Sequence, residues 1–171
     1  MALAGDVPLG VRSSLGSLGA ALRELPAGEL DDDQAEAWVR SVSPVQALVA
    51  SVGALESDEA GRLESGLDRT WTAVRAVAAR ALIPEGGGKI VLLGPPLGTG
   101  AHASALRAGV ENLARTLSVE WARHNVTVTA ITSGAGTDEG QLATVVAFLL
   151  SPAGDYFSGC RLELGAAAVA V

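Results

Sequence analysis

The alternation of short apolar runs with amphipathic segments in the second half of the chain is the sequence feature that most constrains the fold. Residues 89–94 (KIVLLG) form an apolar run closed by glycine and proline, which predicts a buried strand. Residues 125–132 are rich in β-branched side chains and predict the next strand, and residues 156–164 predict the last one. Helices are expected between them, over residues 101–123 and 137–150. This order predicts an α/β fold, a doubly wound parallel sheet with helices on both faces.

The first half of the chain shows the same alternation less cleanly. Residues 46–51 predict a strand, and an apolar stripe that includes Trp71 predicts a long helix over residues 57–83. Two shorter helices are expected over residues 33–42 and 15–25. Because the sequence shows no internal repeat and no linker, we expect a single domain over its 171 residues.

Charge and cysteine content exclude several classes of function. The net charge is −7, with one lysine among 12 basic residues, which argues against nucleic acid or an anionic membrane surface as a partner. Cys160 is the only cysteine, so neither an internal disulfide nor a cysteine-based zinc site can form. His102 and His124 are too few for a metal cluster. With no signal peptide and no apolar run of about 20 residues, we expect a cytoplasmic protein without a membrane span.

The order of these segments resembles a known family. Residues 88–93, 107–123 and 126–131, followed by residues 146–152 and 158–165, resemble the carboxy-terminal half of the short-chain dehydrogenases/reductases. The resemblance covers roughly residues 45–165 and is faint upstream. It implies a Rossmann-like three-layer sandwich, here shortened in its amino-terminal half.

The resemblance places unsuitable residues at the family's catalytic positions. In the family, a tyrosine transfers the hydroxyl proton, and a lysine four residues later lowers the pKa of the phenol and holds the cofactor ribose. Ala103 stands at the tyrosine position and Arg107 at the lysine position. A methyl group transfers no proton, and a guanidinium replaces a tuned ammonium poorly. His102 is adjacent to the lost tyrosine, but its neighbouring position turns its side chain by roughly 100°, so we interpret it as a bystander.

A shift in the alignment does not supply the missing groups. The family's serine position reads Gly94-Pro95-Pro96, and no asparagine precedes Asn112. The only tyrosine is Tyr156 and the only lysine is Lys89. We therefore predict that the chain has no catalytic residues.

The cofactor-binding glycines are also changed. The family's first strand–helix turn reads Thr-Gly-x-x-x-Gly-x-Gly, which lets backbone N–H groups approach the pyrophosphate. The candidate stretch is residues 11–25, where Gly16 and Gly19 are spaced by three rather than two and would form only a vestigial turn. About twenty residues then precede the strand at Gln46, although the family places two strands and a helix there, so that block is expected to be missing. Residues 94–100 lack the Gly-Lys-Ser/Thr ending of a phosphate loop, and we expect no cofactor.

These losses favour a non-catalytic role. Family members commonly pair through their two long helices, here near residues 57–83 and 101–123, so we expect a structural or regulatory subunit of a homodimer or of a heteromer with an active family member. The apolar tail, residues 166–171, would either insert into a partner or pack on the chain itself. Five alanines on these helices are expected to allow close packing: Ala73, Ala76, Ala105, Ala108 and Ala122.

Two alternatives stay open. The first is a residual NAD(P)-dependent oxidoreductase acting on a carbonyl or alcohol, for which only His102 and Arg107 are titratable near residues 99–107. The second is a small-molecule binder that uses the cleft beside Gly94 and Ser133.

Overall fold

A six-stranded parallel sheet forms the centre of the computed structural model, which describes residues 1–28, 31–52, 60–96, 98–99, 102–134 and 136–165, with backbone alone for residues 60–65. Its strand order is β2-β1-β3-β4-β5-β6, and neighbouring strands are parallel throughout. The strands are β1 (Ala2–Ala4), β2 (Arg23–Glu24), β3 (Ala47–Ser51), β4 (Gly88–Gly94), β5 (Val126–Ser133) and β6 (Arg161–Leu164). The expected α/β parallel sheet is confirmed.

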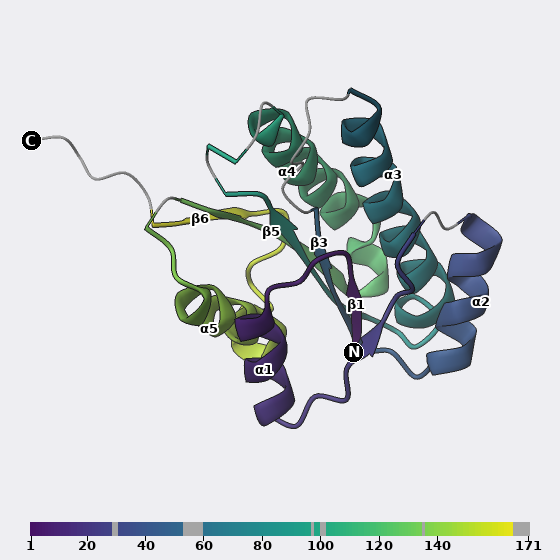
Figure 1. The fold of residues 1–171 in the computed structure, drawn as a ribbon. Helices are drawn as coiled ribbons and strands as arrows, with labels where there is room; N and C mark the ends of the chain where they lie inside the picture. Colours follow the sequence, from purple (N-terminus) through teal and green to yellow (C-terminus); the bar gives the residue numbers. More distant parts are fainter. Residues whose placement is uncertain (29–30, 53–59, 97, 100–101, 135, 166–171) are drawn as a thin grey trace, which may run out of the picture.

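Helices cover both faces of this sheet (Figure 1). One face carries α1 (Leu9–Ser17) and α5 (Glu139–Leu150), and the other carries α2 (Asp32–Val42), α3 (Ala60–Val77) and α4 (Ala103–Glu120). Successive strand residues point to opposite faces, so Val49 packs against the first layer and Leu48 against the second. The sheet thus separates two apolar cores, as in a three-layer sandwich. Within the described residues, no helix is both long and apolar enough to cross a membrane.

The second half of the chain follows the sequence-based expectation closely. β4, α4, β5 and α5 lie within two or three residues of the predicted bounds. Asp138 caps α5 by accepting a hydrogen bond from the Gln141 backbone, and the Gln141 side chain accepts from the Asp138 backbone in return. The last strand begins at Arg161 rather than at residue 156, because a 3₁₀ turn, Pro152–Gly154, and a turn after it occupy the intervening chain.

The long helix of the first half is also confirmed. It consists of α3, continued by a π-helical turn over Ala78–Leu82, and residues 57–59 of the predicted span lie outside the described residues. Ala73 and Ala76, which we expected on an outer packing face, are instead buried in the core. Ala105, Ala108 and Ala122 are exposed.

The amino-terminal elements differ from the prediction. The sequence analysis missed β1, and the helix expected over residues 15–25 is wrong, because α1 begins at Leu9 and ends at Ser17. Gly19, with φ +87°, follows that helix, and β2 then pairs directly with β1. The interval before β3 therefore contains one two-residue strand and α2.

Candidate functional site

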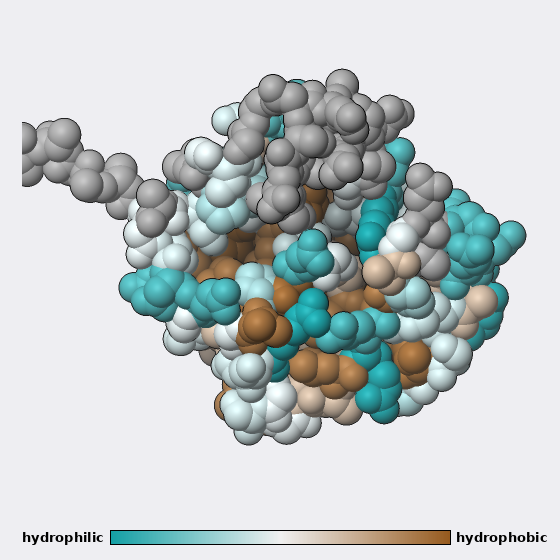
Figure 2. All heavy atoms as spheres, in the orientation of Figure 1, coloured by the Kyte–Doolittle hydropathy of each residue, from teal (hydrophilic) through white to brown (hydrophobic). Residues whose placement is uncertain are grey.

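A cleft of about 310 Å³ lies at the carboxyl ends of the strands. It opens beside the point where the sheet order reverses, because β2 lies on one side of β1 and the later strands lie on the other. Open α/β sheets bind their ligands at such reversal points. Figure 2 shows apolar surface recessed near the centre of its view. The lining residues are Asp6, Pro8, Ser51, Val52, Leu93, Gly94, Pro95, Pro96, Ile131, Ser133 and Leu142.

The turn that leads from β1 into α1 begins at Gly5. Gly5 has φ +69°, and a Cβ added there would overlap the carbonyl oxygen of Ser51 at the end of β3. Both the backbone conformation and the close approach therefore require glycine at this position. Gly5 begins this turn and Gly10 lies in the first turn of α1, so the chain does have a glycine-containing first strand–helix connection.

Gly16 and Gly19 do not belong to that turn, which corrects their assignment as its vestige. Gly16 lies in the last turn of α1, and Gly19 lines a separate hollow with Met1 and Gln46 at the amino ends of the strands. Apart from the adjoining backbone, nothing lies within 4 Å of a Cβ added at either position. The signal that could have located the true turn is the apolar Ala2-Leu-Ala4 run directly before Gly5.

Glu139, from the first turn of α5, reaches the amino terminus of α1. Pro8, the N-cap residue of α1, provides no side-chain cap, and the first turn of α1 contains no acidic residue. The Gly10 N–H donates a 2.7 Å hydrogen bond to Glu139 Oε2. A carboxylate of the chain therefore lies where a parallel α/β fold ordinarily presents its helix terminus to a ligand's phosphate.

Arg107 is buried beneath the other side of the cleft, with 5% of its surface exposed. Its Nη1 donates to the carbonyl oxygens of Pro95 (3.0 Å) and Ser133 (2.8 Å), and its Nη2 donates to Glu163 Oε1 (2.9 Å). Ala103, one helical turn earlier, is buried as well. The structure thus places both residues on α4 as the sequence indicated, and it directs the guanidinium toward the chain's own acceptors.

An ion-pair network continues from Arg107 to the surface. Glu163 also contacts Arg161 at 3.2 Å, Arg161 contacts Glu111 at 3.0 Å, and Glu111 contacts Arg115 at 2.7 Å. The network ties β6 to α4 and fixes the Glu163 carboxylate beside the guanidinium. The spacing of four residues between Glu111 and Arg115 is typical of an ion pair on a helix, whereas sequence reasoning missed the role of Glu163.

Two buried polar atoms, one before α4 and one on β5, have no hydrogen-bond partner within the described part of the chain. They are Nε2 of His102, the residue that precedes α4, and Oγ1 of Thr132 on β5. The Thr132 methyl group would lie 3.1 Å from a Cβ added at Gly94.

The only lysine and the only tyrosine lie away from the cleft. Lys89 is the second residue of β4, at the amino ends of the strands, where Nζ donates to the Leu149 carbonyl (3.3 Å) and pairs with Asp155 (2.5 Å). Tyr156 is 93% exposed on the turn before β6. Neither side chain can take over the family's proton-transfer role at Ala103.

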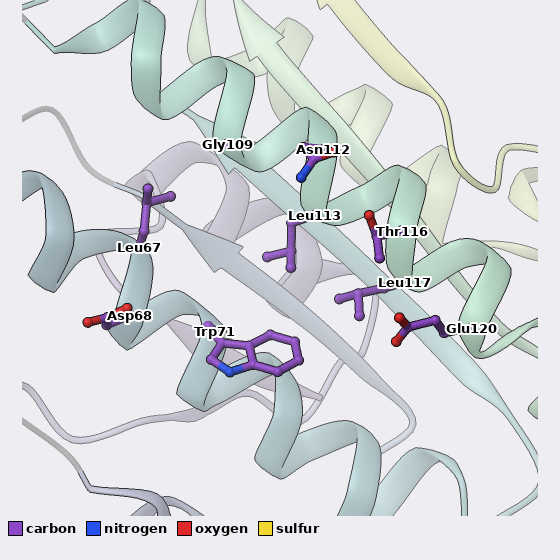
Figure 3. Close-up of a pocket in the computed structure, with 9 residues that line it drawn as sticks. All are labelled: Leu67, Asp68, Trp71, Gly109, Asn112, Leu113, Thr116, Leu117 and Glu120. Atoms are coloured by element: carbon purple, nitrogen blue, oxygen red, sulfur yellow. The ribbon is translucent and has the colours of Figure 1, made fainter.

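A second hollow, of about 360 Å³, lies between α3 and α4 (Figure 3). Trp71 was expected in the core stripe, but 38% of its surface is exposed at this groove. A Cβ added at Gly109 would lie 3.1 Å from Leu67 Cδ2, so the missing side chain brings the two helices together. The groove is lined by Leu67, Asp68, Trp71, Gly109, Asn112, Leu113, Thr116, Leu117 and Glu120.

The described residues contain no group of three or more His, Cys, Asp or Glu side chains that could hold a metal ion. The tail expected to insert into a partner, residues 166–171, lies outside them.

Comparison with known proteins gives both sequence relatives and structural ones. No family model matches the sequence. The chain is 28% identical, over 196 residues, to galactitol 2-dehydrogenase (L-tagatose-forming) from Cereibacter sphaeroides, covering 86% of this chain and 76% of that protein.

Solved structures share the fold at lower identity. BdcA (YjgI) from E. coli matches with a TM-score of 0.70 at 18% identity, covering 95% of each chain. Acetoin dehydrogenase YohF from Salmonella typhimurium matches with 0.74 at 19% identity, covering 88% of this chain and 77% of its own. A putative 3-oxoacyl-reductase from Bacillus thuringiensis matches with 0.73 at 16% identity, covering 97% of this chain and 96% of its own.

Proposed function

This chain belongs to the short-chain dehydrogenase/reductase family as a shortened member, and we propose that it acts there as a non-catalytic subunit, with the cytoplasm as its expected compartment. The observation that carries this proposal is the set of hydrogen bonds that Arg107 makes within its own chain. The residue at the family's lysine position uses three N–H donors on Pro95, Ser133 and Glu163 of its own chain. The residue at the tyrosine position, Ala103, has no proton to transfer.

The residues of the cleft do not fit a dinucleotide. A pyrophosphate needs free N–H groups at the start of α1, yet Gly10 N–H already donates to the Glu139 carboxylate. A ribose needs the ammonium that Arg107 replaces, and the Arg107 guanidinium is paired with Glu163. Asp6 adds a further negative charge to the lining. We derive no reaction step through a cofactor at this site.

The groove between α3 and α4 supports a role in assembly. Leu67, Leu113 and the exposed part of Trp71 present apolar surface there, between two helices that the family uses for pairing. Aromatic residues in such positions commonly dominate the energy of an interface. This face is therefore the one through which we propose that the subunit binds its partner.

Charge at the groove favours a different chain over a second copy. Asp68 and Glu120 lie among its lining residues, and no basic residue is among them. Two copies joined here would bring four carboxylates together, which costs free energy through like-charge repulsion. An active family member with basic residues at the corresponding rim would complement them. The homodimer is the second form of the proposal.

The first test measures binding of NAD(H) and NADP(H) by calorimetry on protein whose mass is known from light scattering. We expect no binding up to millimolar cofactor. Micromolar binding would overturn the non-catalytic assignment.

Neutralising the groove distinguishes the two forms of assembly. The double variant Asp68→Asn, Glu120→Gln should strengthen self-association if a second copy occupies the groove, because it removes the repulsion. It should weaken binding of a co-expressed active family member if that chain is the partner. Light scattering measures the first outcome and calorimetry the second.

The second candidate function is a residual NAD(P)-dependent oxidoreductase. It is favoured by the sequence relative, which is a dehydrogenase, and by the half-buried His102 beside Ala103. It predicts micromolar cofactor binding and turnover of a carbonyl or alcohol substrate that disappears in His102→Ala. If the wild-type chain binds no cofactor, this candidate fails before any substrate is tried.

A further inference from the structure

We propose that the Glu139 carboxylate is an autoinhibitory contact, an anion built into the chain that keeps phosphate ligands out of the cleft. This inference concerns the cleft alone and stands whether or not the chain pairs with another. It starts from the mismatch between the cleft and the dinucleotide that its fold would ordinarily hold.

The contact spans two helices on the same face of the sheet. Glu139 follows β5, Gly10 follows β1, and both strands deliver their helices to the carboxyl edge, where α1 and α5 lie side by side (Figure 1). The 2.7 Å hydrogen bond from the Gly10 N–H places one carboxylate oxygen directly on the first turn of α1. A negative charge is favoured there because the first N–H groups of a helix have no partner within the helix and carry partial positive charge.

Neighbouring residues are arranged so that Glu139 is available for this contact. Asp138 and Gln141 cap α5 between them, so α5 does not need the Glu139 side chain. Pro8 leaves α1 without a cap of its own. A Cβ added at Gly10 would lie 2.8 Å from both Cβ and Oε2 of Glu139, so the carboxylate can approach because residue 10 is glycine.

The contact excludes an external anion for two reasons. The oxygen occupies the N–H donor that a phosphate oxygen would use, and its charge repels a second anion at the same place. Asp6 and Pro8, from the turn before α1, and Leu142, from α5, line the adjoining cleft. A ligand in that cleft with a phosphate at the helix terminus would first have to displace Glu139.

The test uses inorganic pyrophosphate as the probe and the thermal midpoint of unfolding, Tm, as the readout. Glu139→Ala should lower Tm by about 2–4 °C, because α1 loses its cap. Pyrophosphate should then raise the Tm of this variant in a saturable way, while the wild type responds only as it does to sodium sulfate of equal ionic strength. Calorimetry should show pyrophosphate binding to the variant at least tenfold tighter than to the wild type.

Two further variants make the result specific. Glu85→Ala removes the same charge from an exposed turn and should leave pyrophosphate binding at the wild-type level. Glu139→Gln removes the charge but keeps the size, and it should show tighter pyrophosphate binding than the wild type even if Glu139→Ala does not fold. Equal pyrophosphate affinity in wild type and Glu139→Gln would overturn the proposal.

The outcomes also separate this inference from the proposed function. Pyrophosphate binding by the Glu139 variants, with no NAD(H) or NADP(H) binding by the wild type, supports both. Micromolar dinucleotide binding by the wild type overturns both, whereas wild-type pyrophosphate binding without dinucleotide binding overturns the autoinhibitory contact alone.

Discussion

The cleft at the carboxyl ends of the strands and the groove between α3 and α4 differ in how far their side chains are already satisfied by contacts within the chain. Beside the cleft, two charged side chains contact groups of the chain itself, Arg107 with Glu163 and Glu139 with the Gly10 N–H. In the groove, apolar side chains stay at the surface, and part of the Trp71 ring remains exposed. Polar groups satisfied within the chain gain little from a ligand, whereas exposed apolar surface gains free energy when a partner covers it. The difference favours assembly at the groove over ligand binding at the cleft.

The largest effect is expected from removing Arg107, which tests whether its guanidinium is committed to contacts within the chain. Arg107→Ala should lower the free energy of unfolding by about 3 kcal/mol, because a buried carbonyl oxygen, a partly buried one and the Glu163 carboxylate lose their donor. Arg107→Lys should lose less, since it keeps the charge opposite Glu163. Urea denaturation measures both values. A variant as stable as the wild type would mean that the guanidinium is free to serve a ligand.

Gly5 and Gly16 test which end of α1 carries the functional turn. Gly5→Ala should cost about 2–3 kcal/mol of unfolding free energy, because its φ is positive and its Cβ would overlap the Ser51 carbonyl. Gly16→Ala should instead stabilise the chain by about 0.5–1 kcal/mol, since this helical position has open space around it. If Gly16→Ala destabilised the chain and Gly5→Ala did not, the glycine-dependent turn would be at Gly16 instead. The same denaturation experiment gives both results.

Trp71 tests the groove. Trp71→Ala should weaken subunit association by about 2 kcal/mol, or roughly 30-fold in Kd, because the exposed ring is the largest apolar group at the surface of the hollow. Val119→Ala is the matched control, since Val119 is exposed on α4 outside the groove lining. Sedimentation measures self-association, and calorimetry measures binding of a co-expressed family member. If Val119→Ala weakens association as much as Trp71→Ala does, the interface is not centred on the groove.

The smallest expected effect concerns the ion pairs between α2 and the end of the long helix. A hydrogen bond from Arg80, with Arg40 and Arg75 nearby, lowers the pKa of Glu36 below its ordinary value of 4.5. Because the folded-state pKa is depressed, the stabilisation is present above the unfolded-state pKa and is lost as pH falls through the folded-state value. Below about pH 4.5 the wild type should therefore lose stability more steeply than Glu36→Gln. Parallel pH profiles of Tm for the two proteins would contradict this.

The strand–helix order was predictable where local patterns are long and periodic, and not where the elements are short. β4, β5 and the helices beside them have clear apolar runs or stripes, and the structure confirms them. β1 has three residues, two of them alanine, which carry little strand preference, and α1 has only two buried residues. The glycine spacing therefore predicted the cofactor turn from Gly16 and Gly19, at the carboxyl end of α1, whereas the first strand–helix turn lies at its amino end.

The candidate site, too, could be predicted from the sequence only in part. Ala103 and Arg107 could be located from the motif around them, but the partners of Arg107 could not. Glu163 is 56 residues from Arg107, and Glu139 is 129 residues from Gly10. Such pairs depend on how parallel strands bring distant turns to one edge, and no local spacing encodes them.

The two edge strands of the sheet limit how this chain can associate with other chains. β2 pairs with β1 over only two residues, and its exposed Arg23 and Glu24 are charged. At the opposite margin, β6 is four residues long and exposes Arg161. Short, charged edge strands resist extension by a strand from another molecule. Ordered aggregation through the sheet is therefore disfavoured, which leaves the helical surfaces to recruit other chains.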